Sequence, residues 1–241
     1  MKGRISTVTE YIKNIRAELN AAFPHKVELH AHTNPVSSCS EIKPARLVQM
    51  YAELGYSAVC ITNHLARGRS DDAEYFLADY YAAKEEGEKL GLNVILGAEL
   101  RFVPSSNDYL AFGFTPEELP GIIEMLDMNI EEFSRAWRRE DRFLCQAHPY
   151  RENMEQIDRT LVDGIEAFNA HPHHNSRVSV ASRTAHAENL VFVAGTDFHH
   201  PGHQGLSATL TRFAPKTAAD IVSILRSGDY LSEIGGSIII P

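Results

Sequence analysis

The stretch VELHAHTNP, residues 27–35, ends a run of strand character with two imidazole side chains one residue apart. Because side chains in a strand alternate between faces, His30 and His32 should stand side by side on one surface. Imidazole is the commonest metal ligand in proteins, so the pair is typical of a metal site. Two histidines that are each satisfied by hydrogen bonds inside the fold would give the same pattern, and the rest of the chain has to separate these interpretations.

The composition is that of an ordinary globular protein. Of the 241 residues, 44% are hydrophobic and 23% are charged, which suits one domain with a modest extension and a substantial core. The net charge of −9 disfavours binding to nucleic acid or anionic lipid that is driven mainly by electrostatic attraction. It leaves room for a local positive patch around a small anionic substrate.

Apolar residues at helical spacing predict an N-terminal helix within residues 1–24, packed on the remaining residues 25–241. These apolar residues are Ile5, Val8, Ile12, Ile15 and Leu19. The segment does not have the pattern of a signal peptide, and no apolar run approaches the ~20 residues that cross a bilayer. Three cysteines without a CxxC pattern suit reduced thiols, so we expect a cytoplasmic protein.

Strand-like and helix-like patterns alternate along the chain. Strand patterns occupy residues 26–32, 57–62, 93–99, 109–114, 142–148, 164–170 and 190–197, and 237–240 reads as a terminal strand. Alternation of this kind implies parallel βα units, and about seven such units would close into a barrel. An open, doubly wound α/β sheet fits the same periodicity.

Residues of the metal-ligand type follow nearly every predicted strand. They are His30, His32, Asn63, His64, Glu99, His148, Asn169, His171, His173, Asp197 and His199. In a barrel of βα units the carboxyl ends of the strands converge on one rim, so these groups would meet there. Taken one at a time, each histidine could be an ordinary hydrogen-bonded residue and each carboxylate a helix cap. A single metal cluster, in contrast, explains the positions of all of these residues together.

Imidazole and carboxylate ligands together suit Zn²⁺, Fe²⁺ or Mn²⁺. More ligands than one ion can use indicate two or three divalent ions, with a carboxylate bridging between them. Such a cluster favours hydrolysis, above all of phosphate esters.

Six motifs occur in order along the chain. They are ELHAHT (28–33), ITNHL (61–65), GAE (97–99), AHPY (147–150), GIEAFN (164–169) and GTDFHH (195–200). Together they resemble the ordered motifs of the PHP (polymerase and histidinol phosphatase) family. The resemblance implies a distorted, TIM-like (β/α)7 barrel over residues 25–241, a trinuclear metal site at the strand ends, and phosphoester hydrolysis.

The resemblance also implies a set of metal ligands. The first metal would be bound by His30, His32, Glu99 and Asp197, the second by Glu99 and His148, and the third by His64 and His199.

The sequence departs from the family pattern at three positions. The family usually has Asp or His shortly after HxHT, where Cys39 is the nearest substitute, and a histidine between Glu99 and His148, where Asp108 falls in the slot. Asn63 stands where the family commonly has Asp, so it either orients a neighbouring ligand or caps the turn.

A mechanism for a small phosphorylated substrate follows from these residues. We expect His199 or His173 to protonate the leaving group. Anion-binding candidates are Arg177, which could clamp the phosphate bidentately, with Arg101 and Arg67 behind it, and His171. Each arginine could equally be a solvated surface charge.

Other functions fit parts of the same pattern. An amidohydrolase-like enzyme acting on C–N bonds also begins with HxH and ends with Asp, although no bridging lysine is evident at a strand end. A non-catalytic, PHP-like metal-binding module is the other alternative. The acidic composition disfavours nucleic acid as a partner but leaves oligonucleotides open.

Overall fold

The computed structural model describes the backbone of residues 2–240 and the side chains of residues 8–240. The helices are α1 (Lys2–Ala22), α2 (Pro44–Glu53), α3 (Ala73–Leu90), α4 (Leu119–Glu124), α5 (Ile130–Trp137), α6 (Val178–Ala187) and α7 (Ala218–Ser227), with short 3-10 helices at η1 (Pro116–Glu118), η2 (Met125–Asp127) and η3 (Arg159–Leu161). Among the described residues, none of the helices combines the length and apolar character that a bilayer crossing demands.

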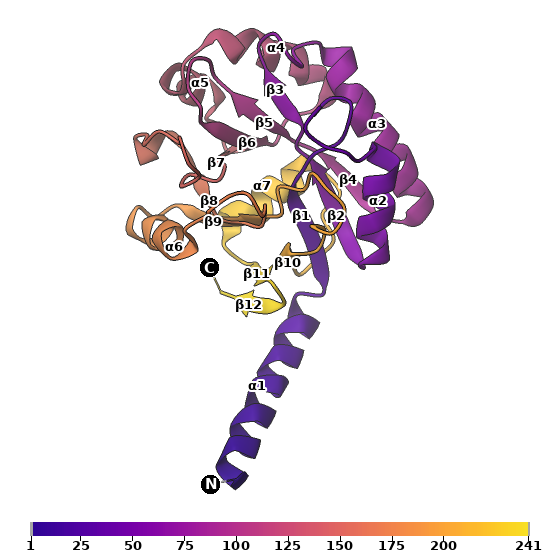
Figure 1. The fold of residues 1–241 in the computed structure, drawn as a ribbon, viewed down its shortest axis with the longest axis vertical. Helices are drawn as coiled ribbons and strands as arrows, with labels where there is room; N and C mark the ends of the chain where they lie inside the picture. Colours follow the sequence, from indigo (N-terminus) through magenta and orange to yellow (C-terminus); the bar gives the residue numbers. More distant parts are fainter. Residues whose placement is uncertain (1, 241) are drawn as a thin grey trace.

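The strands form a mixed α/β architecture. They are β1 (His25–Ala31), β2 (Tyr56–Ile61), β3 (His64–Ala66), β4 (Asn93–Leu96), β5 (Ala98–Arg101), β6 (Asp108–Phe112), β7 (Phe143–Gln146), β8 (Gly164–Asn169), β9 (Val191–Gly195), β10 (Ser207–Thr211), β11 (Leu231–Ile234) and β12 (Ser237–Ile239). One six-stranded sheet has the order β12-β11-β10-β1-β2-β4, and the other has the order β3-β5-β6-β7-β8-β9 (Figure 1).

The two sheets are continuous through the chain, because β2 leads into β3 and β4 leads into β5. Near the other end of the strand order, Phe198, just after β9, forms an isolated parallel bridge with Ala31 of β1. The Phe198 amide donates to the His30 carbonyl at 3.1 Å, and the His32 amide donates to the Phe198 carbonyl at 3.0 Å. Within residues 2–240 the strands thus form two joined sheets and not one closed barrel.

The expectation of parallel strands is correct for part of the fold. Strands β1, β2 and β4 are parallel, as are β7, β8 and β9. It is wrong for β6, which runs antiparallel to both β5 and β7, and for β10 to β12. The connection from β5 to β6 spans only residues 102–107 and holds no helix, so the chain turns back on itself. The start of β6 therefore lies at the same edge as the end of β5.

Helices α2 and α3 cover the outer side of β1, β2 and β4 (Figure 1). Helix α2 begins with a proline at its first position and buries Leu47, Val48 and Tyr51 in the main core. Helix α3 is capped by Asp72, whose side chain accepts from the Tyr75 amide at 2.7 Å. Burial of these helices fixes the parallel strands whose ends carry the candidate site.

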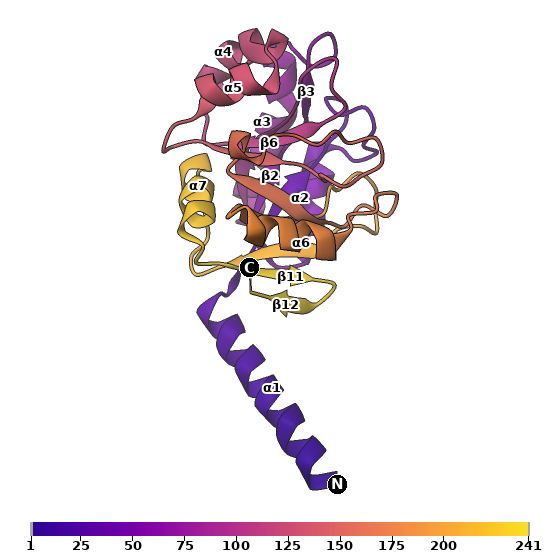
Figure 2. The same ribbon diagram turned by 90° about the vertical axis from the view of Figure 1, so that its left-hand side faces the viewer.

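Helix α1 projects from the rest of the molecule (Figures 1 and 2). Its side chains Val8, Tyr11 and Ile12 are 55%, 66% and 59% exposed. Among its described side chains, Leu19 packs against the core and Arg16 donates to the Gly236 carbonyl at 2.6 Å. The predicted helix is present, and its packing on residues 25–241 beyond these contacts stays a prediction.

Gly113, just after β6, is a position where the backbone requires glycine. Its φ is +102°, and a Cβ there would overlap the Asp141 carbonyl oxygen. We expect Gly113→Ala to lower the free energy of unfolding by more than about 1 kcal/mol, measured by urea denaturation. Gly121→Ala is the matched control, because a Cβ at Gly121 meets open space in helix α4. Equal stability of the two variants would contradict the prediction.

Candidate metal centre

His30 and His32 lie side by side at the end of β1, as the strand pattern predicts. Both side chains are fully buried, and their ring centroids are 5.0 Å apart. Within residues 8–240, neither Nε2 atom has a hydrogen-bond partner. A buried polar atom without a partner is costly, so two such atoms on adjacent imidazoles indicate a missing ligand.

Carboxylates from strand β5 and from the segment just after β9 face these nitrogens. His30 Nε2 lies 3.4 Å from Glu99 Oε1 and 3.3 Å from Asp197 Oδ1. His32 Nε2 lies 3.3 Å from Glu99 Oε2 and 3.2 Å from Asp197 Oδ1. Two imidazoles and two carboxylates from three separate segments therefore converge on one point.

Glu99 of β5 is the most central of these groups. Its Oε1 is also 3.0 Å from His148 Nε2, and its Oε2 is 2.7 Å from His64 Nδ1. Burial alone would raise the pKa of Glu99, but the positive charges on His64 and His30 hold it well below its usual range. One carboxylate in contact with four imidazoles has the geometry of a bridging ligand.

A further group of imidazoles surrounds His32. The ring centroids of His64 and His199 each lie 4.4 Å from that of His32, and His199 Nδ1 donates to the Asp197 carbonyl at 2.8 Å. Partial burial opposes ionisation of Cys39, but hydrogen bonds to His199 and His64 lower the pKa of its thiol to about 6. Cys39, the nearest substitute for the usual Asp or His of the family, thus lies beside His199 and His64.

The chain offers four overlapping groups of ligand atoms, each within 4.8 Å of one another. They are His30 with His32 and Asp197; His32 with His64 and His199; Glu99 with Asp108 and His148; and His148 with His174 and Asp197. The buried His30 Nε2, His32 Nε2, His148 Nδ1 and His174 Nδ1 are all unpartnered among the described residues. Imidazole and carboxylate donors without thiolates suit Zn²⁺, Fe²⁺ or Mn²⁺, so these residues fit a cluster of divalent ions.

Glu166, in the middle of β8, holds two of these histidines in place. Its buried carboxylate accepts from His30 Nδ1 at 2.8 Å, from the His148 amide at 2.9 Å and from Asn169 Nδ2 at 2.8 Å. A carboxylate on the outer nitrogen of a ligating histidine fixes which nitrogen faces the metal. Glu166 has no predicted role above, although an acid inside an otherwise apolar strand is a signal in the sequence.

Asn63 organises the loop that follows β1. Its Oδ1 accepts from the Thr33 amide at 2.7 Å, and its Nδ2 donates to Thr33 Oγ1 at 2.9 Å and to Asp79 Oδ2 at 3.3 Å. The side chain therefore orients the segment directly after His32. Of the two roles open in the sequence, orientation of a neighbouring ligand agrees with these contacts.

Two candidate ligands have unusual backbone conformations. His148 has φ of 29° and Asp197 has φ of 51°, both in the left-handed region that non-glycine residues rarely occupy. Strain of this kind concentrates at functional sites, where the surrounding structure holds it. Burial alone would raise the pKa of Asp197, but the charge on His30 and the close approach of the His174 imidazole hold it well below its usual range.

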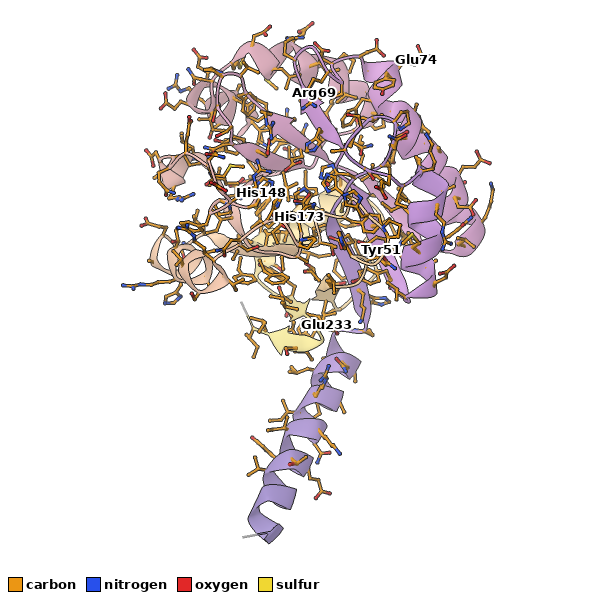
Figure 3. All side chains as sticks on the ribbon, in the orientation of Figure 1. Tyr51, Arg69, Glu74, His148, His173 and Glu233 are labelled. Atoms are coloured by element: carbon orange, nitrogen blue, oxygen red, sulfur yellow. The ribbon has the colours of Figure 1, made fainter. Side chains whose placement is uncertain are left out.

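The loop of residues 171–174 follows β8 and lies over the cluster. His174 Nδ1 is 3.1 Å from Asp197 Oδ2, and the His174 and His148 ring centroids are 5.1 Å apart. The His171 ring lies 5.3 Å from that of His199, whereas His173 is exposed (Figure 3). Burial lowers the pKa of His171 to about 3. His174 was not among the predicted ligands, although the same strand-end logic applies to it.

The arginines predicted to bind substrate lie in different settings. Arg101 makes two 2.6 Å hydrogen bonds to the buried carboxylate of Asp108. Arg67 is paired with Asp127 at 2.7 Å and with Asp71 at 3.3 Å. Arg177 is exposed at the start of α6.

Arg101 is the arginine that the structure brings next to the cluster. Its partner Asp108 belongs to the same group of potential ligands as Glu99 and His148. Arg67 is already engaged by acidic partners on helix η2 and on the loop before α3. Its substrate role stays a prediction, as does that of Arg177.

The fold and the site together define a class of protein. A model of the PHP domain family matches residues 28–235, and the chain therefore belongs to this family. This match confirms the resemblance of the ordered motifs. A comparison with curated proteins finds no match.

Solved structures share the fold at low sequence identity. A two-domain protein from Bacteroides vulgatus that contains a predicted PHP-like metal-dependent phosphoesterase has a TM-score of 0.65 and 17% identity. That match covers 87% of this chain and 64% of the relative, so the chain spans less than two thirds of that protein.

Two further structures resemble most of the chain. PsfC from Pseudomonas syringae has a TM-score of 0.56 at 19% identity, covering 83% of this chain and 88% of that one. An amidohydrolase from Chromobacterium violaceum, with bound sulfate and no metal, has a TM-score of 0.50 at 15% identity, covering 73% and 88%. At these identities the likeness shows the fold alone.

Gly195, at the end of β9, makes room for the Glu166 carboxylate. A Cβ at this position would overlap Glu166 Oε1 and lie 2.7 Å from His30 Cβ. We expect Gly195→Ala to displace this carboxylate and to weaken metal binding by about 10–100-fold, measured by calorimetric titration with Mn²⁺ or Zn²⁺. Gly121→Ala should bind like the parent chain, and unchanged affinity in Gly195→Ala would show that Glu166 does not support the centre.

Proposed function

We propose that the protein is a metal-dependent phosphoesterase that hydrolyses a small phosphate ester with two or three divalent ions. The observation that carries this proposal is the position of Glu99, whose buried carboxylate lies within 3.4 Å of nitrogen atoms of four histidines. A bridging carboxylate surrounded by imidazoles with unpartnered nitrogens suits adjacent divalent ions. Membership of the PHP family supports the same chemistry.

The proposed ligand assignment follows the resemblance and the distances. His30, His32, Glu99 and Asp197 hold the first ion, Glu99 and His148 share the second, and His64 and His199 contribute to the third, with Cys39 beside them. The proposed fold is a distorted barrel of the PHP type, in which the bridge between Ala31 and Phe198 joins the two sheets.

When bound, the ions supply Lewis-acid chemistry for phosphate ester hydrolysis. The chain prepares the nitrogens that would face them. Glu166 accepts a hydrogen bond from His30 Nδ1 at 2.8 Å, and Ser37 Oγ lies 3.1 Å from His32 Nδ1. Both contacts leave Nε2 directed at the carboxylates of Glu99 and Asp197.

The proton donor to the leaving group is His199 or His173. Burial alone would lower the pKa of His199, but Cys39 and Asp197 raise it above its ordinary value, which favours the protonated imidazole. A histidine that ligates a metal is not protonated, so binding of an ion at His199 passes this role to His173 on the exposed loop.

Two arginines and one neutral imidazole at the same edge would receive the phosphate. Arg101 stands beside Asp108, and Arg177 and His171 lie at the two ends of the segment that connects β8 to α6. Guanidinium groups bind phosphate oxygens bidentately, which suits a small anionic ester. The acidic composition disfavours long nucleic acids as substrates.

The proposal is tested with Asp197→Ala. Asp197 contacts His30, His32 and His174, so its loss should remove metal and lower phosphatase kcat by at least about 100-fold. Turnover of an aryl phosphate is measured in Mn²⁺, Zn²⁺ and Fe²⁺, with metal content determined by elemental analysis. Asp229→Ala, which removes an exposed partner of Arg212, is the control. Full metal content and full turnover in Asp197→Ala would refute the assignment.

A substrate panel separates the alternatives. Aryl phosphate monoesters, diesters and anilides are offered to the metal-loaded protein under the same conditions. We expect turnover of the phosphate esters, whereas faster turnover of anilides would indicate an amidohydrolase. A metal-loaded protein that turns over none of them would indicate a non-catalytic module.

A further inference from the structure

The proposed second metal position lacks one ligand in this sequence. No histidine lies between Glu99 and His148, and Asp108 occupies the slot. We propose that His174, on the loop between β8 and α6, completes this position, and that Asp108 instead holds Arg101 and Arg151 beside it. The inference rests on the proposed metal cluster and concerns which residues build it.

Asp108 is engaged by cations on both of its oxygens. Oδ1 accepts from Arg101 Nε at 2.6 Å, and Oδ2 accepts from Arg101 Nη2 at 2.6 Å and from Arg151 Nη2 at 3.1 Å. The carboxylate is fully buried, and its nearer oxygen lies 3.8 Å from His148 Nε2. Metal ligation would compete with a bidentate, charge-assisted pair, and losing that pair would leave the half-buried Arg101 without its carboxylate.

His174 has the opposite character. Its Nδ1 is buried and makes no hydrogen bond among the described residues, although Asp197 Oδ2 lies 3.1 Å away. Ligand atoms of His148, His174 and Asp197 all lie within 4.8 Å of one another, and His148 Nδ1 is unpartnered as well. One nitrogen from each imidazole and one carboxylate oxygen of Asp197 are therefore close enough to meet at a single ion.

The loop that carries His174 is tied to the carboxylates of the cluster. Asn169 Nδ2 donates to Glu166 Oε2 at 2.8 Å and to Asp197 Oδ2 at 3.1 Å, while its Oδ1 accepts from the His171 amide at 2.9 Å. The His174 amide then donates to the His171 carbonyl at 3.0 Å, and the two rings stack 4.2 Å apart. These contacts hold the His174 ring over Asp197.

Asp197 would then serve two ions, as Glu99 does. Its Oδ1 lies 3.3 Å from His30 Nε2 and 3.2 Å from His32 Nε2, and its Oδ2 lies toward His174. The first and second ions would share both carboxylates. Asp108 would keep two guanidinium groups next to the second ion, where they can meet the oxygens of an anionic ester.

The inference is tested by counting metal. Parent chain, His174→Ala, Asp108→Asn and the control His186→Ala, which removes an exposed histidine of α6, are equilibrated with Mn²⁺ or Zn²⁺ and analysed for metal per chain. Co²⁺ loading gives an independent spectroscopic readout of the coordination. We expect His174→Ala to weaken the most loosely held ion by about tenfold or more. Asp108→Asn should keep the full metal content and raise KM for an aryl phosphate, because Arg101 and Arg151 lose their anchor.

Three outcomes would overturn the inference. Full metal content with an unchanged Co²⁺ spectrum in His174→Ala would exclude His174 as a ligand. Loss of an ion in Asp108→Asn would return the ligand role to Asp108, whether or not His174→Ala also loses metal. A parent chain that binds no metal would refute the proposed function itself, and this result is distinguishable from the other two because it needs no variant.

Discussion

Compensation of buried carboxylates by imidazoles is the constraint on which the site depends. Glu99 and Asp197 are almost completely buried, and ionised carboxylates in such positions are strongly disfavoured unless they are paired. Histidines from separate strands supply the pairing, within 3.4 Å of each carboxylate. The imidazoles retain unpartnered nitrogens, however, so the protein groups alone leave the cluster incomplete. Divalent cations would satisfy both the remaining negative charge and the free nitrogens.

Local backbone features allow this arrangement. The absence of a side chain at Gly195 lets Glu166 reach His30, and left-handed conformations at His148 and Asp197 turn two side chains toward the centre. The reversal at β6 brings Asp108 to the edge where β5 ends. None of these features stabilises a strand or a helix by itself. Each either restricts the backbone to an unfavourable conformation or buries a charged side chain.

The positions of several strand-end groups could be predicted because their signal is local, while their role as ligands stays a prediction. The HxH pattern and a strand-to-loop transition place His30, His32 and Asp197 without any knowledge of long-range contacts. The strand predicted over residues 93–99 is instead two strands, and Glu99 lies inside the second, β5. The direction of β6 was mispredicted, because hydrophobic periodicity is the same for parallel and antiparallel strands. The extent of α1 packing could not be read from the sequence for a similar reason, since an apolar stripe does not say what covers it.

Glu166 and His174 were missed because their roles depend on contacts between distant segments. Glu166 and His30 are 136 residues apart in the sequence. The residues around a buried acid in a strand do not indicate which distant side chain it contacts.

His174 lies on the loop between β8 and α6, which His171 and Asn169 connect to the cluster, whereas His32, His148 and Asp197 each lie within two residues of the end of a strand. Loops vary and move more readily than the strands that they join. If His174 is a metal ligand, the ordered loop and the bound second ion stabilise each other. An ion that binds only when the loop is ordered favours the ordered loop. The same segment leads to Arg177, so metal loading would also organise the groups that meet the substrate.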